Sequence, residues 1–426
     1  MRILLSLILI LALAFLGHRW PSQLGEGPHK RIARFFGQGV GLIAIGIALG
    51  PLGLNLIDQE ILSVLTPLKV LTLAWVGLLF GLQFDRAVMG PGPPKRLIGL
   101  FLLEGLGSGW VTALFCLPWI MGVIGGGDGI RENGSVGWLP VIGGLYFTIS
   151  ALAGCSSYYE SSDAEIRRAT RKWPLRPFFH YAAAGDQLVA LLLLWAVAAF
   201  GTPTGGAGGG WVWISLPLFL GVAAGFLIAL LSSRRVGRQD RLTIAMGGVL
   251  LVSGVAMNMN LPVLLVSTIA GIVIANASPG SSKLSEELLP AERPLFLVML
   301  LLIGTSWRPG QWGIALGLAL TYTVGRVLAK FGFAWITGSR IGHRPSELGM
   351  GLLFQGAFAL AVLIDSSWFL HPEWADTVST ALLLGILMSD ALGAASFTRL
   401  SGQWLASEGM MPPDENATSI QEEAAL

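Results

Sequence analysis

Thirteen long apolar runs divide this chain, and its Lys and Arg residues gather in every second segment between them. The runs lie near residues 3–17, 36–54, 62–83, 97–121, 136–157, 177–200, 211–231, 242–257, 261–277, 294–307, 313–337, 347–364 and 375–399. The odd-numbered segments between runs hold most of the 27 Lys and Arg residues, whereas the even-numbered segments hold only Arg131 and Arg308. Cytoplasmic loops beside membrane-spanning helices retain Lys and Arg. The pattern predicts an all-α polytopic membrane protein of about 13 transmembrane helices, with its N-terminus outside and its C-terminus inside.

The first apolar run has two interpretations. It could be a cleaved signal peptide, with the small residues at 12–14 as the cleavage site. Cleavage would leave the basic segment 19–34 outside the membrane, against the charge rule. A retained first helix is therefore favoured.

Composition indicates a single membrane domain. With 53% apolar and only 12% charged residues, the chain has too little polar surface to solvate a globule of 426 residues. We expect one transmembrane domain over residues 1–400 and a short, disordered cytoplasmic tail over 401–426, in a multi-pass protein of the cell membrane, of the bacterial inner-membrane type. A net charge of +2 gives no reason to expect nucleic acid. Both cysteines, Cys116 and Cys155, fall within apolar runs, so neither a disulfide framework nor a metal cluster is predicted.

Charged residues inside the apolar runs are the first functional candidates, because an ionisable group in hydrocarbon is costly unless it is paired or wet. The deepest are Glu104, Asp186, Arg326, Lys330 and Asp390. Counted from the cytoplasmic ends of their helices, four of them lie roughly 10 to 15 Å deep, near one level of the bilayer. A shared wet cavity would account for this common depth.

Two apolar runs also contain helix-breaking residues at similar depth. The fifth reads ISALAGCSS, with Ser150, Gly154 and Ser156, and the twelfth reads LLFQGAFAL, with Gln355 and Gly356. Interrupted helices in corresponding positions of two halves indicate a transporter site, and the three-helix units around these two runs have opposite orientations, as an inverted repeat requires. Small residues that merely allow close helix packing are the alternative.

Several segments resemble the cation:proton antiporter superfamily. GLIAIGIALGPLGLNLI and VGLLFGLQFD are similar to two of its motifs, with Gln83 where Glu is common, and PLFLVMLLLIGTSW is similar to a later one. GRVLAKFGFAWITGSRIG followed by ELGMGLLFQGAFALAV resembles the family's lysine-bearing helix and its next, interrupted helix. The resemblance spans about residues 36–400. It implies panel helices at about 36–83 and 211–307 that form a homodimer, and core helices at about 97–200 and 313–399 that move against them.

The resemblance also implies roles for individual residues. Asp186 matches the carboxylate that binds cation and proton in turn, and Lys330 matches the basic residue that neutralises the crossing of two interrupted helices. Hydroxyls and carbonyls of the first interrupted segment would complete the oxygen coordination of a hard cation. The hydroxyls concerned belong to Thr148, Ser150 and Ser156.

Four further residues are assigned to the supporting charge and the crossing region: Glu104, Arg326, Gln355 and Asp390. Alternative interpretations remain for three of the charged positions. Lys330 could snorkel toward the cytoplasmic interface, Asp390 could pair with Lys330 or Arg326, and Glu104 could be a packing or interface residue. Gly185 and Ala357 depart from the family pattern, which commonly has polar or acidic residues there.

The expected function is exchange of a monovalent cation, Na⁺ or K⁺, for protons across the membrane, by competition at Asp186. With one carboxylate, we expect electroneutral exchange of one proton per cation. A sodium-coupled symporter of an organic solute on a related inverted-repeat fold is an alternative, and a non-transporting degenerate member is another. An enzyme is not predicted, because no run contains His-x-x-x-His, Asp-x-x-Asp or Gly-x-Ser-x-Gly, and no cofactor or resident metal is expected beyond the transported cation.

Overall fold

The computed structural model describes residues 2–23, 40–85, 95–125, 138–156, 175–201, 210–232, 237–277, 281–341, 344–370 and 372–407. This part of the chain is helical and contains no strand. Its helices are α1 (Arg2–Gln23), α3 (Val40–Leu49), α4 (Gln59–Leu82), α6 (Lys95–Gly125), α8 (Trp138–Gly154), α10 (Arg176–Gly201), α11 (Gly210–Ser232), α12 (Arg238–Asn258), α13 (Val263–Ala277), α14 (Ser281–Ser306), α15 (Trp312–Ile341), α16 (Pro345–Gly351), α17 (Gly356–Ser367) and α18 (Pro372–Ser407). Each predicted apolar run thus contains a helix, and the twelfth run contains two.

Seven of the described helices are long and apolar enough to cross a membrane. The number rises to eight if α16 and α17, which meet at a 55° bend, form one broken span. Three shorter apolar helices cover Ile3–Phe15, Leu145–Gly154 and Val263–Ala277. The protein is therefore a multi-pass membrane protein, whereas the count of thirteen spans and the orientation stay predictions.

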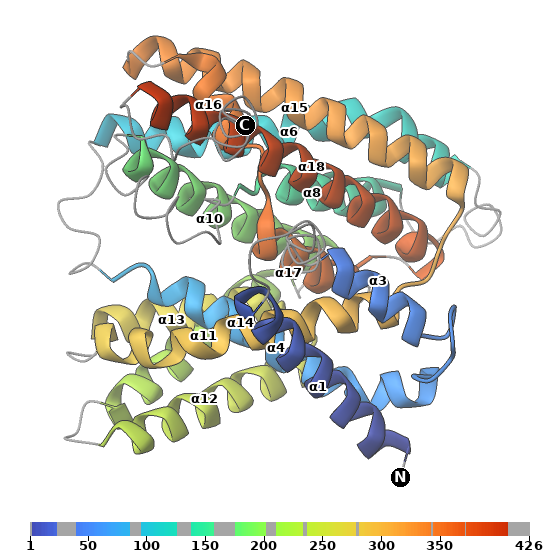
Figure 1. Ribbon diagram of the computed structural model, residues 1–426, viewed down its shortest axis with the longest axis vertical. Helices are drawn as coiled ribbons and strands as arrows, with labels where there is room; N and C mark the ends of the chain where they lie inside the picture. The colour runs from blue at the N-terminus through green and yellow to red at the C-terminus, as the bar shows by residue number, and fades with distance from the viewer. Residues whose placement is uncertain are drawn as a thin grey trace, which may run out of the picture.

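The helices form two groups (Figure 1). One group contains α6, α8, α10, α15, α16 and α18, and the other contains α1, α3, α4 and α11 to α14, with packing contacts dense inside each group. Helix α17 lies between them, because it packs on α8, α10 and α18 on one side and on α4 and α13 on the other. In the second group, α1 packs against α14 with Ile10 and Ala14 buried.

Glycine allows backbone-to-backbone contact between helices of the second group. A Cβ atom at Gly46 of α3 would lie 2.4 Å from the carbonyl oxygen of Leu301 in α14. A Cβ atom at Gly81 of α4 would lie 2.2 Å from the carbonyl oxygen of Thr268 in α13. Small residues at such contacts let membrane helices approach closely, so these pairs are packed through their main chains.

The C-terminal end corrects one prediction. Residues 401–426 were expected to be a disordered tail, but α18 continues to Ser407. Leu400 is buried in a cluster with Phe179 and Leu348, and Trp404, one turn further along, packs against the same cluster. Burial of these side chains holds the last turns of α18 in place, while residues 408–426 lie outside the described residues.

The chain's two cysteines are shielded. Cys116 on α6 and Cys155, directly after α8, are both free thiols with no exposed surface. Neither thiol faces water, so neither offers a reactive site to a polar reagent.

Candidate functional site

A buried ion cluster, made of Glu104, Asp186 and Lys330, joins α6, α10 and α15. Lys330 Nζ lies 2.8 Å from Asp186 Oδ2 and 2.7 Å from Glu104 Oε1. The Lys330 and Asp186 side chains have no exposed surface, and that of Glu104 has almost none. Lys330 therefore does not snorkel to an interface, and Glu104 is an ion-pair partner in the interior rather than a packing residue.

The end of α8 contributes neutral oxygens to the ion cluster. Lys330 Nζ also donates to the carbonyl oxygen of Gly154, at 3.1 Å, and to Ser156 Oγ, at 3.0 Å. The Ser156 hydroxyl in turn hydrogen-bonds Asp186 Oδ2. Gln187 Nε2 donates to the Ser156 carbonyl at 3.2 Å and so fixes the chain after the helix. The helix ends at Gly154 and the next two residues are non-helical, as the sequence predicts for the first interruption.

Several oxygens of the predicted site residues are buried without a hydrogen-bond partner in the described part of the chain. They are Asp186 Oδ1, Glu104 Oε2 and the hydroxyl oxygens of Thr148 and Ser150. Gly105 leaves room beside Asp186, since a Cβ atom there would approach Oδ1 to 2.7 Å. Carboxylate and hydroxyl oxygens are the ligands that hard cations prefer, and a buried polar atom with no partner calls for a functional explanation. The two carboxylates together offer unshared acceptors to a cation or a proton.

Arg326 connects the two helix breaks. It is fully buried on α15, one turn before Lys330. Its Nη2 donates to the carbonyl oxygen of Cys155 at 2.5 Å and to that of Leu352 at 3.3 Å, and its Nη1 donates to that of Leu353 at 2.9 Å. The carbonyl ends of α8 and α16 carry partial negative charge. The resemblance implied this neutralising role for Lys330, which contacts the carbonyl end of α8 through Gly154. Arg326 contacts both breaks, because its guanidinium fork can serve several carbonyls at once.

Asp390 caps the second half of the broken span. Its Oδ1 accepts hydrogen bonds from the backbone N–H groups of Gln355, at 2.7 Å, and Gly356, at 3.1 Å. These groups lie at the N-terminus of α17, where the helix dipole favours a negative charge. The alternative interpretation, in which Asp390 pairs with Lys330 or Arg326, is not seen among the described residues, because the carboxylate binds the N-terminus of α17 instead.

Gln355 links the two breaks through its side chain. Its Nε2 donates to the carbonyl oxygen of Leu152 on α8, at 2.6 Å, and to the hydroxyl oxygen of Tyr322 on α15, at 2.8 Å. At the second break, Arg326 therefore contacts the carbonyl end of α16 and Asp390 contacts the amide end of α17. The side-chain amide of Gln355 links the break to α8.

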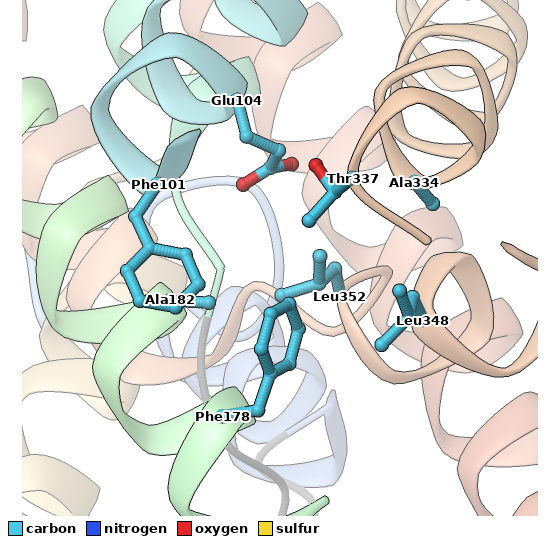
Figure 2. Close-up of a pocket in the computed structure, with 8 residues that line it drawn as sticks. All are labelled: Phe101, Glu104, Phe178, Ala182, Ala334, Thr337, Leu348 and Leu352. Carbon is cyan, nitrogen blue, oxygen red and sulfur yellow. The ribbon is translucent and has the colours of Figure 1, made fainter. Parts of the chain in front are cut away.

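A narrow apolar crevice adjoins the ion cluster (Figure 2). It is lined by Phe101, Glu104, Phe178, Ala182, Ala334, Thr337, Leu348 and Leu352. The Glu104 carboxylate points into the crevice toward Thr337, with the rings of Phe101 and Phe178 alongside. Its empty space of about 220 Å³ is too finely divided to admit a water molecule. The lining residues of α10, α15 and α16 lie toward the predicted cytoplasmic ends of these helices.

Sequence reasoning missed three supporting residues: Gly105, Gln187 and Tyr322. A signal existed for two of them, because Gln187 follows Asp186 directly and Gly105 forms a Gly-x-x-x-Gly pattern with Gly109. Tyr322 had none, since its hydroxyl matters only through the partner that folding brings to it.

Asp365 lies apart from the ion cluster. Its side chain is fully buried on α17 and accepts hydrogen bonds from the backbone N–H groups of Val263, at 3.1 Å, and Leu264, at 2.9 Å. A carboxylate of α17, the helix between the two groups, therefore caps the first turn of α13 in the second group.

Solved structures of known proteins have a similar fold over nearly the whole chain. No protein-family model matches the sequence, and no curated protein sequence matches it. A structure of the sodium/proton antiporter MjNhaP1 from Methanocaldococcus jannaschii at pH 8 is similar, with a TM-score of 0.64 and 14% identity over 94% of this chain and 99% of that one. A second, from an electron-microscopy map of MjNhaP1, has a TM-score of 0.59 and 15% identity over 96% and 100% of the two chains. At this identity the likeness is one of fold, and it extends over nearly the full length of both chains.

Proposed function

From the premise that the chain has the fold of a cation:proton antiporter, we propose that it exchanges a monovalent cation, Na⁺ or K⁺, for protons by competition at Asp186. The observation that carries the proposal is the ion cluster, in which two buried carboxylates share one lysine and each keeps an unpartnered oxygen. Ionisable residues inside membrane domains are rare, pair with one another and mark ion pathways.

Competition follows from the position of Lys330. Its ammonium sits where a transported cation would sit, against Asp186 Oδ2 and the Ser156 hydroxyl. An arriving cation replaces the ammonium on Asp186 with the same charge, and Lys330 retains Glu104 as its partner. A proton on Asp186 releases the cation and lets Lys330 return.

The charges of the cluster favour electroneutral exchange. With all three groups ionised, two carboxylates and one ammonium leave one net negative charge. One monovalent cation or one proton reduces that charge to zero, so either loaded form can cross the membrane barrier, whereas the bare form is held back by its charge. Exchange of one for one follows as long as Lys330 keeps its proton.

The movement we propose uses the two helix groups. The core at about 97–200 and 313–399 carries the ion cluster past the panel at about 36–83 and 211–307, and the panel forms a homodimer in a bacterial inner membrane. The two breaks, with their charged caps, would let the core keep an ordered polar site inside a moving body.

A sodium-coupled symporter of an organic solute is the second candidate. It needs a polar cavity that holds the solute beside the ion site. The crevice next to Glu104 is apolar and closed to water, which favours a small inorganic ion over an organic solute.

The test uses purified protein in liposomes that contain a pH dye and start with an acidic interior. Addition of Na⁺, K⁺ or Li⁺ should alkalinise the interior, and Asp186→Asn should abolish the response, because an amide cannot alternate between proton and cation. Asp376→Asn, at an exposed position on α18, is the matched control and should transport normally. No response from folded protein to any of the three ions would favour the symporter or a non-transporting protein.

The stoichiometry has its own measurement. On a solid-supported membrane, one-for-one exchange should give no transport current when cation is added. A transient transport current that is absent in Asp186→Asn would contradict electroneutrality and indicate that Lys330 also exchanges its proton.

A further inference from the structure

A polar cavity, separate from the ion cluster and its apolar crevice, lies between α4 and the end of α14. Its polar lining consists of Gln59, Ser63, Thr66 and Lys69 from α4, with Ser306 and Arg308 from the end of α14. The cavity has a volume of about 330 Å³. Since a water molecule takes up about 30 Å³, this volume is large enough for a small polyatomic ion.

The polar residues of α4 lie on one face of the helix. Positions 59, 63, 66 and 69 are spaced by four, three and three residues, the spacing that aligns side chains on a helix surface. The helix is otherwise long and apolar enough to cross a membrane. A polar stripe therefore runs from the start of α4 into the span and ends at Lys69.

The cavity is positively charged and lacks an acidic partner. Lys69 Nζ has a single contact, with Ser306 Oγ at 3.4 Å, and within the described part of the chain neither Lys69 nor Arg308 forms an ion pair. No Asp or Glu lines the cavity. A lysine inside a membrane span without a counter-charge is costly, and an anion bound beside it would offset that cost.

The hydroxyl groups that line the cavity already donate their hydrogen bonds within their own helices. Ser63 donates to the carbonyl oxygen of Glu60, and Thr66 donates to that of Leu62. Ser306 likewise donates within its own helix, to Leu302 at 2.7 Å. The groups left to donate into the cavity are the ammonium of Lys69, the guanidinium of Arg308 and the amide of Gln59.

We propose that this cavity binds a phosphate-type anion between Lys69 and Arg308. Arginine and lysine are the side chains that recognise phosphate oxygens, the first as a fork and the second as a point charge. Gln59 begins α4, and Arg308 lies two residues after the end of α14 at Ser306, so the mouth lies at the ends of two spans, on the predicted external side. The phosphodiester of a membrane lipid and a free phosphate ion both reach this level.

Thermal unfolding of the purified full-length protein in detergent tests the proposal. The probes are dihexanoyl-phosphatidylglycerol, its zwitterionic phosphatidylcholine analogue, and sodium phosphate against sodium chloride at equal ionic strength. We expect an anionic probe to raise the melting temperature, with a half-saturating concentration at least tenfold higher in Lys69→Gln and Arg308→Gln. Arg293→Gln, at an exposed position near the other end of the α14 apolar stretch, should respond like the wild type.

The probes separate the two sources. A shift with phosphatidylglycerol alone assigns the site to a lipid headgroup, and a shift with inorganic phosphate, alone or as well, assigns it to the phosphate group itself. Equal shifts with the anionic and zwitterionic lipids and none with phosphate would overturn the proposal, as would shifts that persist in both variants. If Lys69→Gln does not fold, Arg308→Gln decides, because the exposed Arg308 side chain is not needed for packing.

Discussion

Glu104 gives the ion cluster its second negative charge, and this charge should set the affinity for the cation. In Glu104→Gln, Asp186 and Lys330 alone would sum to zero, so a bound cation would leave a net positive charge in a buried site. We expect the cation concentration that half-saturates exchange to rise about tenfold or more, which corresponds to roughly 1.4 kcal/mol of binding free energy. The liposome assay measures this value, and the exposed Glu286→Gln on α14 is the control. An unchanged half-saturating concentration would show that Glu104 does not contribute to the affinity for the cation.

At the residue scale, the sequence identified the charged members of the site but not their partners. Glu104, Asp186 and Lys330 could be singled out because ionisable residues are rare in apolar runs. Arg326 and Lys330 are four residues apart and share one face of α15, so periodicity cannot say which of them reaches the carboxylates and which reaches the helix breaks. That assignment depends on side-chain reach and on how neighbouring helices are rotated, which only the folded structure fixes.

The start of α17 depends on a glycine. Gly356 has a φ of 69°, a conformation that L side chains rarely adopt. Gly356→Ala should therefore destabilise the protein by about 1–2 kcal/mol, seen as a lower melting temperature in detergent. Gly247→Ala on α12 is the matched control, because nothing lies within 4 Å of the added methyl group and alanine favours a helix. A loss of similar size in both variants would place the effect outside the backbone conformation of α17.

The hydrogen bonds between Asp365 and α13 should influence how fast the two helix groups move past each other. Asp365 of α17 accepts two backbone hydrogen bonds from α13, and movement of α17 with the first group past α13 must break them. Asp365→Ala should raise the maximal exchange rate about fivefold, the effect of roughly 1 kcal/mol, with the half-saturating cation concentration unchanged. Ser366→Ala is the control, because the Ser366 hydroxyl bonds only its own helix, at Leu363. A shift in cation affinity at constant rate would argue against this role.

At the element scale, helix interruptions were predictable and helix ends were less so. Gly154 ends α8, and Gln355 and Gly356 begin α17, because Gly and polar residues inside an apolar run weaken a helix locally. The end of α18 could not be placed, since Leu400 and Trp404 prolong the helix by packing against residues distant in sequence. The cap on α17 was missed for the same reason, because Asp390 lies on a different helix.

The orientation of the whole molecule can be tested with the native cysteines in place, since both are buried. Gln311 and Gln239 are exposed residues near opposite predicted faces, outside and inside respectively. We expect an impermeant maleimide to label Gln311→Cys in intact cells and to label Gln239→Cys only after permeabilisation. The wild-type protein is the control and should stay unlabelled. The reverse pattern would invert the orientation read from the basic residues.

At the scale of the whole molecule, charge and hydropathy predicted the order of the helices but not their arrangement. Every predicted apolar run contains a helix, because some twenty apolar residues have few other ways to satisfy their backbone in a bilayer. The division into two groups was predicted only from the resemblance to known antiporters. Glycine contacts, such as that of Gly81 of α4 with α13, cannot be read from the sequence, because it does not say which helix a glycine will meet.

The contact of Lys330 with both carboxylates bears on how a cell conserves its proton-motive force. An exchanger whose binding site stood open when sodium or potassium was scarce would let protons run down their gradient without useful work. Here an internal ammonium already holds Asp186 and Glu104, and the crevice beside Glu104 is closed to water. If the ion cluster works as proposed, the idle transporter would resist such leakage, and it would draw on the gradient only when a cation arrives to displace the lysine.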